Sequence, residues 1–74
     1  MNELSKSLYL IAGQLLRKLR LSKDLTLVDL EHKSNIPFKT IQRYEVGSRK
    51  INKETLKLLL SLMGKDYDEF MGEV

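Results

Sequence analysis

Apolar residues recur at intervals of three and four along the whole chain, and no segment alternates apolar and polar residues for long enough to form a strand. Near the N-terminus this spacing predicts a helix over residues 5–22. The apolar stripe of that helix consists of Leu4, Leu8, Ile11, Leu15 and Leu19, widened by Ala12 and Leu16. Arg17 and Lys18 fall outside the stripe. The pattern predicts an all-α fold.

Turn and capping residues divide the rest of the chain into four shorter helices, which makes a chain of five helices. The expected ranges of these four are 27–33, 37–46, 53–63 and 67–72. Thr26 and Asp29 have the spacing of an N-cap and an acidic first turn, so they open the first of the four. Asp66 and Glu69 have capping-box spacing and open the last one.

The turn before the helix at 37–46 is short. Asn35 tolerates the left-handed conformation that a tight turn needs, and Pro37 suits the first turn of a helix because its missing N–H is no loss there. Gly47 is placed to end that helix. Apolar residues on both sides of the turn are expected in the core, and they are Leu25, Leu30, Ile36, Ile41 and Tyr44.

The length of 74 residues suits one domain, here 1–74, with residues 1–10 as an N-terminal extension of the first helix. The chain has no cysteine, a lone His32 and no nucleophile or phosphate-loop motif, so we expect no metal, no cofactor and no enzymatic activity. The longest apolar run near the N-terminus, residues 8–12, is too short for a signal peptide or a membrane span. We therefore expect a cytoplasmic protein without a membrane partner.

Positive charge is concentrated in one part of the chain. Residues 33–53 contain six lysines and arginines and a single acid, Glu45, so this segment has a net charge of +5 in a chain whose total is +3. A one-sided basic field suits a polyanion such as nucleic acid. Charge alone leaves a second interpretation open, in which these side chains only keep a surface solvated.

The order of the five helices also resembles a known family. The resemblance rests on the segments AGQLLRKLR, DLTLVDLE, RYEVGSRK and ETLKLLLSLMGKDYDEF, and on Leu30, Asn35, Ile36, Ile41, Tyr44, Glu45 and Gly47. Over residues 12–71 the chain resembles the helix-turn-helix domain of phage repressors and Cro, the XRE family, which implies a compact lambda-repressor-like fold. Leu27 stands where that family often has a phosphate-binding Gln, and Glu31 stands where it usually has a small residue.

The resemblance implies that the helix at 37–46 enters the major groove of double-stranded DNA. Its outward side chains are then expected to contact base edges, and these are Phe38, Lys39, Gln42 and Arg43. Phosphate contacts are expected from Thr26, Thr40, Arg49, Lys50 and Lys53. Free N–H groups around residues 26–28 could bind a phosphate in place of the missing Gln. Arg20 and Glu45 match a pair that forms an internal salt bridge in relatives.

Leu58 and Leu62 exceed what the core of a lone domain needs, and they suggest a self-association surface. Relatives often dimerise through their C-terminal helices, so the resemblance adds Tyr67, Phe70 and Met71 to the expected dimer surface. The expected function is that of a sequence-specific transcriptional regulator, most simply a Cro-like repressor, that binds an inverted-repeat operator as a symmetric homodimer.

Two other interpretations stay open. A protein-protein interaction module, such as an antirepressor, an adaptor or an inhibitor, could keep the fold and bind a regulatory protein partner. Leu27, Glu31 and the extra leucines favour that module, whereas the basic segment favours DNA. The chain could also be the DNA-reading part of a larger protein.

Overall fold

The computed structural model describes the backbone of residues 3–74 and the side chains from Leu8 onward, so residues 1–2 and the side chain of Leu4 lie outside it. The described chain forms five helices and no strand, which confirms the all-α prediction. The helices are α1 (Glu3–Ser22), α2 (Leu27–Ser34), α3 (Phe38–Val46), α4 (Lys53–Leu62) and α5 (Tyr67–Glu73). Every helix end lies within two residues of the expected one.

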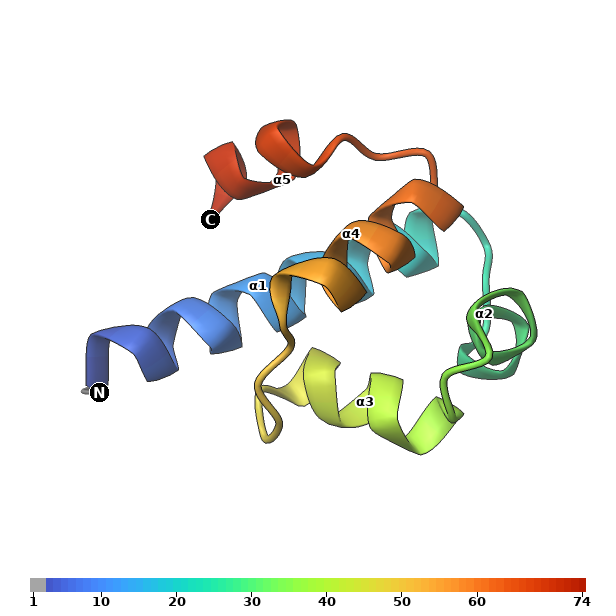
Figure 1. Ribbon diagram of the computed structural model, residues 1–74, viewed down its shortest axis with the longest axis horizontal. Helices are drawn as coiled ribbons and strands as arrows, with labels where there is room; N and C mark the ends of the chain where they lie inside the picture. Colours follow the sequence, from blue (N-terminus) through green and yellow to red (C-terminus); the bar gives the residue numbers. More distant parts are fainter. Residues whose placement is uncertain (1–2) are drawn as a thin grey trace.

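The helices surround one core in a molecule that measures 34 × 25 × 20 Å. α3 packs mainly against α1 and α2, while α4 contacts α2 and α5. In Figure 1, α3 lies below α1 and α5 lies above α4, so these two short helices occupy opposite sides of the molecule. The N-terminal half of α1 projects beyond the other helices at the left of that view. No helix of residues 3–74 combines the length and apolar character that crossing a bilayer requires.

The core receives side chains from all five helices. Its buried members are Ala12, Leu16, Leu30, Ile41, Tyr44, Leu56, Leu59, Leu60, Met63 and Phe70. Each fully buried leucine or isoleucine stabilises the fold by about 1.5–3 kcal/mol. Leu25 and Ile36, which were also expected in the core, pack against it from partly buried positions.

The predicted apolar stripe of α1 is only partly buried, and its N-terminal end lies outside the core. Leu8 and Ile11 are 44% and 38% exposed, whereas Ala12 and Leu16 are buried. The reason is the projection of α1 beyond its neighbours, because the first turns of the helix have fewer elements to pack against (Figure 1).

Side-chain caps begin three of the helices. Thr26 Oγ1 accepts a hydrogen bond from the Asp29 N–H at 3.0 Å, as expected for the start of α2. Asn52 Oδ1 accepts from Thr55 in α4, and the Asp66 carboxylate accepts from Glu69 in α5. Pro37 differs from the prediction: its ψ of 138° is extended, so it precedes α3 as the N-cap and lies outside the first turn.

Two glycines bring α1 and α3 into close contact. A Cβ atom on Gly13 would overlap the carbonyl oxygen of Tyr44 and lie 2.7 Å from that of Glu45. Gly47 ends α3 with a φ of +77°, which glycine adopts without strain, and a Cβ there would lie 2.9 Å from Leu10 Cδ1. The spacing of the two helices therefore depends on the absence of side chains at both positions.

Candidate nucleic-acid interface

The turn between α2 and α3 is held by local hydrogen bonds. Asn35 has a φ of 62° and donates its N–H to the carbonyl of Glu31 at 2.7 Å, which closes the end of α2. Ser34 Oγ accepts from the N–H of Ile36 at 3.1 Å. Asn35 thus takes the left-handed conformation that the sequence predicts, and the turn sets the direction in which α3 leaves α2.

Leu27 and Glu31, the two residues that differ from the family pattern, both lie on α2 and are partly buried. Leu27 is partly buried and packs against the core. Glu31 is half-buried and lines a shallow depression with His32, Asn35 and Pro37. Among the described residues Glu31 forms no ion pair, so its carboxylate reaches solvent and not a basic partner.

α3 divides its side chains between the core and the surface. Its buried residues are Ile41, Tyr44 and Glu45. Lys39 and Arg43 are exposed and four residues apart, so both lie on one side of the helix. Within the described chain neither side chain has an ion-pair partner. Two cations are therefore presented together on the face turned away from the core.

The two other expected base-contact residues are also at the surface. Phe38 is 36% exposed at the first turn of α3. Gln42 is exposed and lines a groove that it shares with Gln14 of α1 and Leu27 of α2. Gln42 therefore lies on the flank of α3 toward α1, to one side of Lys39 and Arg43.

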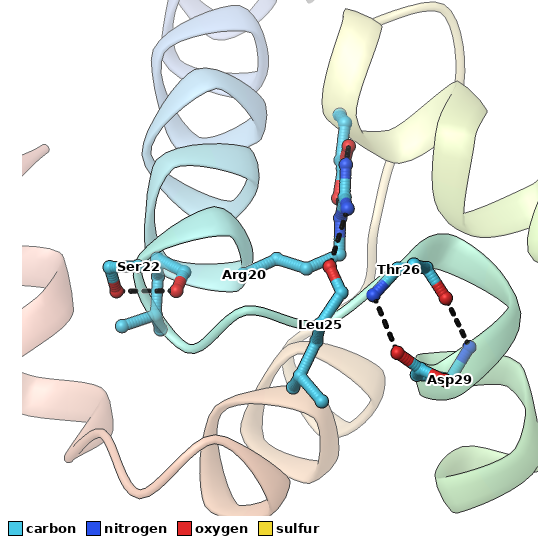
Figure 2. Close-up of polar contacts among 7 residues, drawn as sticks. Arg20, Ser22, Leu25, Thr26 and Asp29 are labelled. Carbon is cyan, nitrogen blue, oxygen red and sulfur yellow. Dashed lines mark hydrogen bonds and ion pairs between the residues drawn. The ribbon is translucent and has the colours of Figure 1, made fainter.

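A buried ion pair anchors α3 to the end of α1. Arg20 Nε donates to Glu45 Oε2 at 2.7 Å and Arg20 Nη2 donates to Oε1 at 3.0 Å, so the expected salt bridge is present. Arg20 Nη1 also donates to the Leu25 carbonyl at 2.8 Å, as Figure 2 shows. Both charged residues are less than a tenth exposed. Breaking such a pair costs about 3–5 kcal/mol, so Arg20 holds α1, the following loop and α3 in one geometry.

The start of α2 differs from the expected phosphate site. The Asp29 carboxylate accepts a hydrogen bond from the N–H of Thr26 at 2.9 Å (Figure 2). The Thr26 N–H is thus not free for a phosphate, and the prediction that it is free was wrong. The hydrogen bond from the Thr26 backbone lowers the pKa of Asp29, so a negative charge stays beside this helix end. The Thr26 hydroxyl is exposed and still has a proton to donate.

Of the remaining phosphate candidates, two lie on α3 or in the loop after it and two are lysines beside tyrosine rings. Thr40 is half-buried on α3, and Arg49 is exposed in the following loop, where its N–H donates to the carbonyl of Arg43 at 3.3 Å. Lys50 Nζ lies 5.4 Å from the centre of the Tyr9 ring. Lys53 Nζ lies 5.4 Å from the ring centre of Tyr67 in α5, so this cation is drawn toward α5 and away from α3.

One residue of the expected dimer surface belongs to the core. Phe70 is 1% exposed, because α5 turns it inward against the other helices. Leu58 and Met71 are 42% and 40% exposed, and Leu62 and Tyr67 are half-buried. Tyr67 and Met71 line a groove with Leu8, Tyr9 and Ala12 of α1, and neither Leu58 nor Leu62 lines it. The expected surface therefore does not form one patch around Phe70.

Sequence reasoning missed the role of Gly13 and a groove beside α3. Gly13 could have been noticed as a lone glycine inside a helical pattern, which often marks a close approach of backbones. The groove has a volume of about 650 Å³ and lies between α1, α2 and α3. Its exposed apolar residues are Leu10, Leu21 and Val46.

Comparison with known proteins gives a match to a protein family. A family model described as helix-turn-helix matches residues 16–70, which run from the middle of α1 into α5. No curated protein and no solved structure matches the chain. The matched range contains all the expected base and phosphate contacts.

Proposed function

Because the chain belongs to the XRE-type helix-turn-helix family, whose members are DNA-binding regulators and not enzymes, we propose that it represses transcription from a specific operator. In this proposal α3 lies in the major groove and reads base edges. The side chains that read are those predicted from the sequence, namely Phe38, Lys39, Gln42 and Arg43. The basic segment around α3 supplies the attraction to DNA.

The exposed pair of Lys39 and Arg43 is the observation that carries the proposal. Both lie on one side of a helix that Ile41 and Tyr44 anchor in the core. The guanidinium of Arg43 can donate two hydrogen bonds to guanine O6 and N7, and Lys39 can reach the same acceptors or a phosphate. The Arg20–Glu45 pair supports the proposal, because a reading helix must keep its angle when it enters a groove.

Phosphate contacts are proposed around the reading helix. The hydroxyls of Thr26 and Thr40 donate to phosphates, and Arg49 and Lys50 follow the DNA backbone beyond the end of α3. Lys53 contributes only after leaving the Tyr67 ring, so we expect its contribution to be the smallest of the group.

We further propose a symmetric homodimer on an inverted-repeat operator. Two copies of α3 must enter major grooves on one face of the duplex, so the half-sites are separated by about 34 Å. Leu58, Leu62, Tyr67 and Met71 are the surface residues proposed to join the copies. Phe70 is excluded from this set because it is buried.

Binding to a labelled random-sequence duplex, followed by fluorescence anisotropy at several salt concentrations, tests the proposal. We expect a dissociation constant of roughly 1–100 μM near physiological salt, with affinity that rises steeply at low salt. An operator can then be selected from a random pool. Absence of binding at low salt would refute DNA recognition.

A protein-binding module is the second candidate function. The apolar groove beside α3 and the Asp29 carboxylate at the start of α2 favour it, since neither feature attracts DNA. A partner seated in this groove would cover Gln42 and block α3. Under this candidate, random duplex is not bound and substitution of Arg43 has no effect on the partner's affinity.

A further inference from the structure

A second groove lies on the side of the molecule away from α3. It is formed by the N-terminal half of α1, the start of α4 and α5, and it has a volume of about 240 Å³. Its apolar lining consists of Leu8, Ala12, Ile51, Leu56, Met71 and Val74. Small-molecule sites usually measure about 300–1,000 Å³, so this groove has the size for a few side chains and not for a cofactor.

Lysines surround this groove and stand over its two tyrosines. Lys50 Nζ lies 5.4 Å from the ring centre of Tyr9. Lys53 and Lys57 lie 5.4 Å and 5.2 Å from the ring centre of Tyr67. A tyrosine face attracts a cation only weakly compared with a carboxylate, so each lysine keeps most of its capacity to bind an anion.

Among the described residues, no acid forms an ion pair with Lys50, Lys53 or Lys57. No aspartate or glutamate side chain is among the described residues that line the groove. Two acids of α5, Glu69 and Glu73, instead pair with Lys65 at 3.6 Å and 2.7 Å. Lys65 and Glu73 line a different groove, beside Phe70. The groove thus combines an apolar floor with a positive rim.

We propose that this groove docks an amphipathic helix with acidic flanks that belongs to another protein. Apolar side chains of such a helix, spaced three or four residues apart, fill the floor between Leu8 and Met71. Its carboxylates pair with Lys53 and Lys57 on the rim. The inference goes beyond DNA binding. Tyr67 and Met71 also belong to the proposed dimer surface, so the acidic helix binds the monomer and competes with a second copy of the chain for this groove. Since α3 and α5 lie on opposite sides of the molecule, the helix docks while α3 stays free (Figure 1).

Two labelled peptides and the full chain provide the test. The first is a synthetic helix of about 15 residues with leucine on one stripe and glutamate elsewhere, and the second has lysine in place of every glutamate. Fluorescence anisotropy is expected to show binding of the acidic peptide alone, with an affinity that falls as salt rises.

Paired charge reversals locate the site. We expect Lys53→Glu with Lys57→Glu to weaken binding of the acidic peptide by roughly tenfold or more, since attraction on the rim becomes repulsion. The matched control, Lys18→Glu with Lys23→Glu, makes the same change of charge at exposed residues outside the groove. It is expected to change the affinity by roughly twofold or less. All four positions are exposed, and thermal melting checks that both variants fold.

Three results would overturn the proposal. They are equal binding of both peptides, absence of binding by the acidic one, and equal losses in the two double variants. A further result assigns the groove to a second copy of the chain. In that case sedimentation equilibrium finds a dimer that Met71→Glu dissociates, while the acidic peptide does not bind.

Discussion

Arg43 and Lys50 are both exposed cations close to α3, but they are attached to different parts of the fold. Arg43 lies on the helix itself, whereas Lys50 lies in the following loop beside Tyr9. In the proposed complex, the guanidinium reads a base and the ammonium attracts a phosphate. Substitutions of these two residues should therefore have effects of different kinds.

Arg43→Ala is expected to lower affinity for the selected operator by about 1–3 kcal/mol and to reduce discrimination at one base pair. Lys50→Ala is expected to weaken all duplexes to a similar degree and to reduce the salt dependence of binding. Anisotropy titrations on the operator and on single-base variants measure both effects. Lys57→Ala, whose ammonium lies over Tyr67, serves as the control. Unchanged sequence preference in Arg43→Ala would contradict the placement of α3.

Gly13→Ala is expected to destabilise the protein although alanine favours helices. The added Cβ would meet the Tyr44 and Glu45 carbonyl oxygens, which belong to a backbone that cannot move aside easily. We expect a net loss of up to about 2 kcal/mol, since overpacking usually costs about 1–3 kcal/mol and helix propensity returns about 1 kcal/mol at most. Urea unfolding measures it. Gly72→Ala, with no atom within 4 Å of its added Cβ, should be neutral or stabilising.

The Asp29 carboxylate affects both the stability and the charge of the start of α2. Its oxygens accept the Thr26 N–H and its own N–H binds the Thr26 hydroxyl, so the first turn of α2 is closed on itself. The same carboxylate adds negative charge at the start of α2, where a helix would otherwise attract an anion. In the proposed complex, this charge opposes a phosphate near the Thr26 hydroxyl.

The lowered pKa of Asp29 predicts a pH dependence of stability. A carboxyl whose pKa is lower in the folded than in the unfolded state stabilises the fold above its unfolded value of about 3.8. That contribution is lost as the pH falls through the folded-state pKa. The difference in Tm between the wild type and Asp29→Asn should therefore shrink below about pH 3.8. Asp68→Asn, a carboxylate of the first turn of α5, is the control.

Asp29→Asn is also expected to strengthen DNA binding. Removal of a negative charge beside the start of α2 should raise affinity for every duplex by roughly two- to fivefold at low salt, and by less at high salt. Anisotropy on random duplex and on operator measures this change. An effect confined to one sequence would show instead that Asp29 takes part in reading bases.

Elements and their ends were largely predictable because the signals for them are local. Apolar spacing, Thr26, Asn35 and Gly47 depend on residues a few positions away, and their consequences appear in the structure. Burial was less predictable, since it depends on what lies across from each face. Phe70 was expected at the surface, because no sequence pattern shows which face of α5 turns toward the core.

The candidate site was predictable to a similar extent. The pattern of α3 placed Lys39 and Arg43 at the surface, and the family resemblance paired Arg20 with Glu45. Contacts between elements were not visible in the sequence, and the position of Lys53 over Tyr67 depends on how α5 packs beside α4. The capture of the Thr26 N–H by Asp29 is local, but its consequence for a phosphate at this helix end became clear only from the hydrogen bond itself.

At the scale of the whole molecule, the proposed dimer makes a geometric prediction. The protein is 34 Å in its longest dimension, which is close to the rise of one turn of B-DNA, so two copies can stand on adjacent major grooves. Insertion of about five base pairs between half-sites turns the second site to the opposite face of the duplex. We expect this insertion to abolish cooperative binding, and insertion of about ten to restore part of it. Equal affinity for all three spacings would indicate binding as a monomer.

The nine residues of α3 divide into those that anchor the helix in the core and those that face outward. Ile41, Tyr44 and Glu45 fasten the helix to the core, and none of them is among the outward residues that would read DNA. In the proposed complex, operator preference can therefore diverge among descendants of this chain, or be grafted from one relative to another, by exchanging only positions 38, 39, 42 and 43. Because all four positions are exposed, such exchanges are expected to change the stability of the domain little, so new specificities can arise without a compensating change elsewhere.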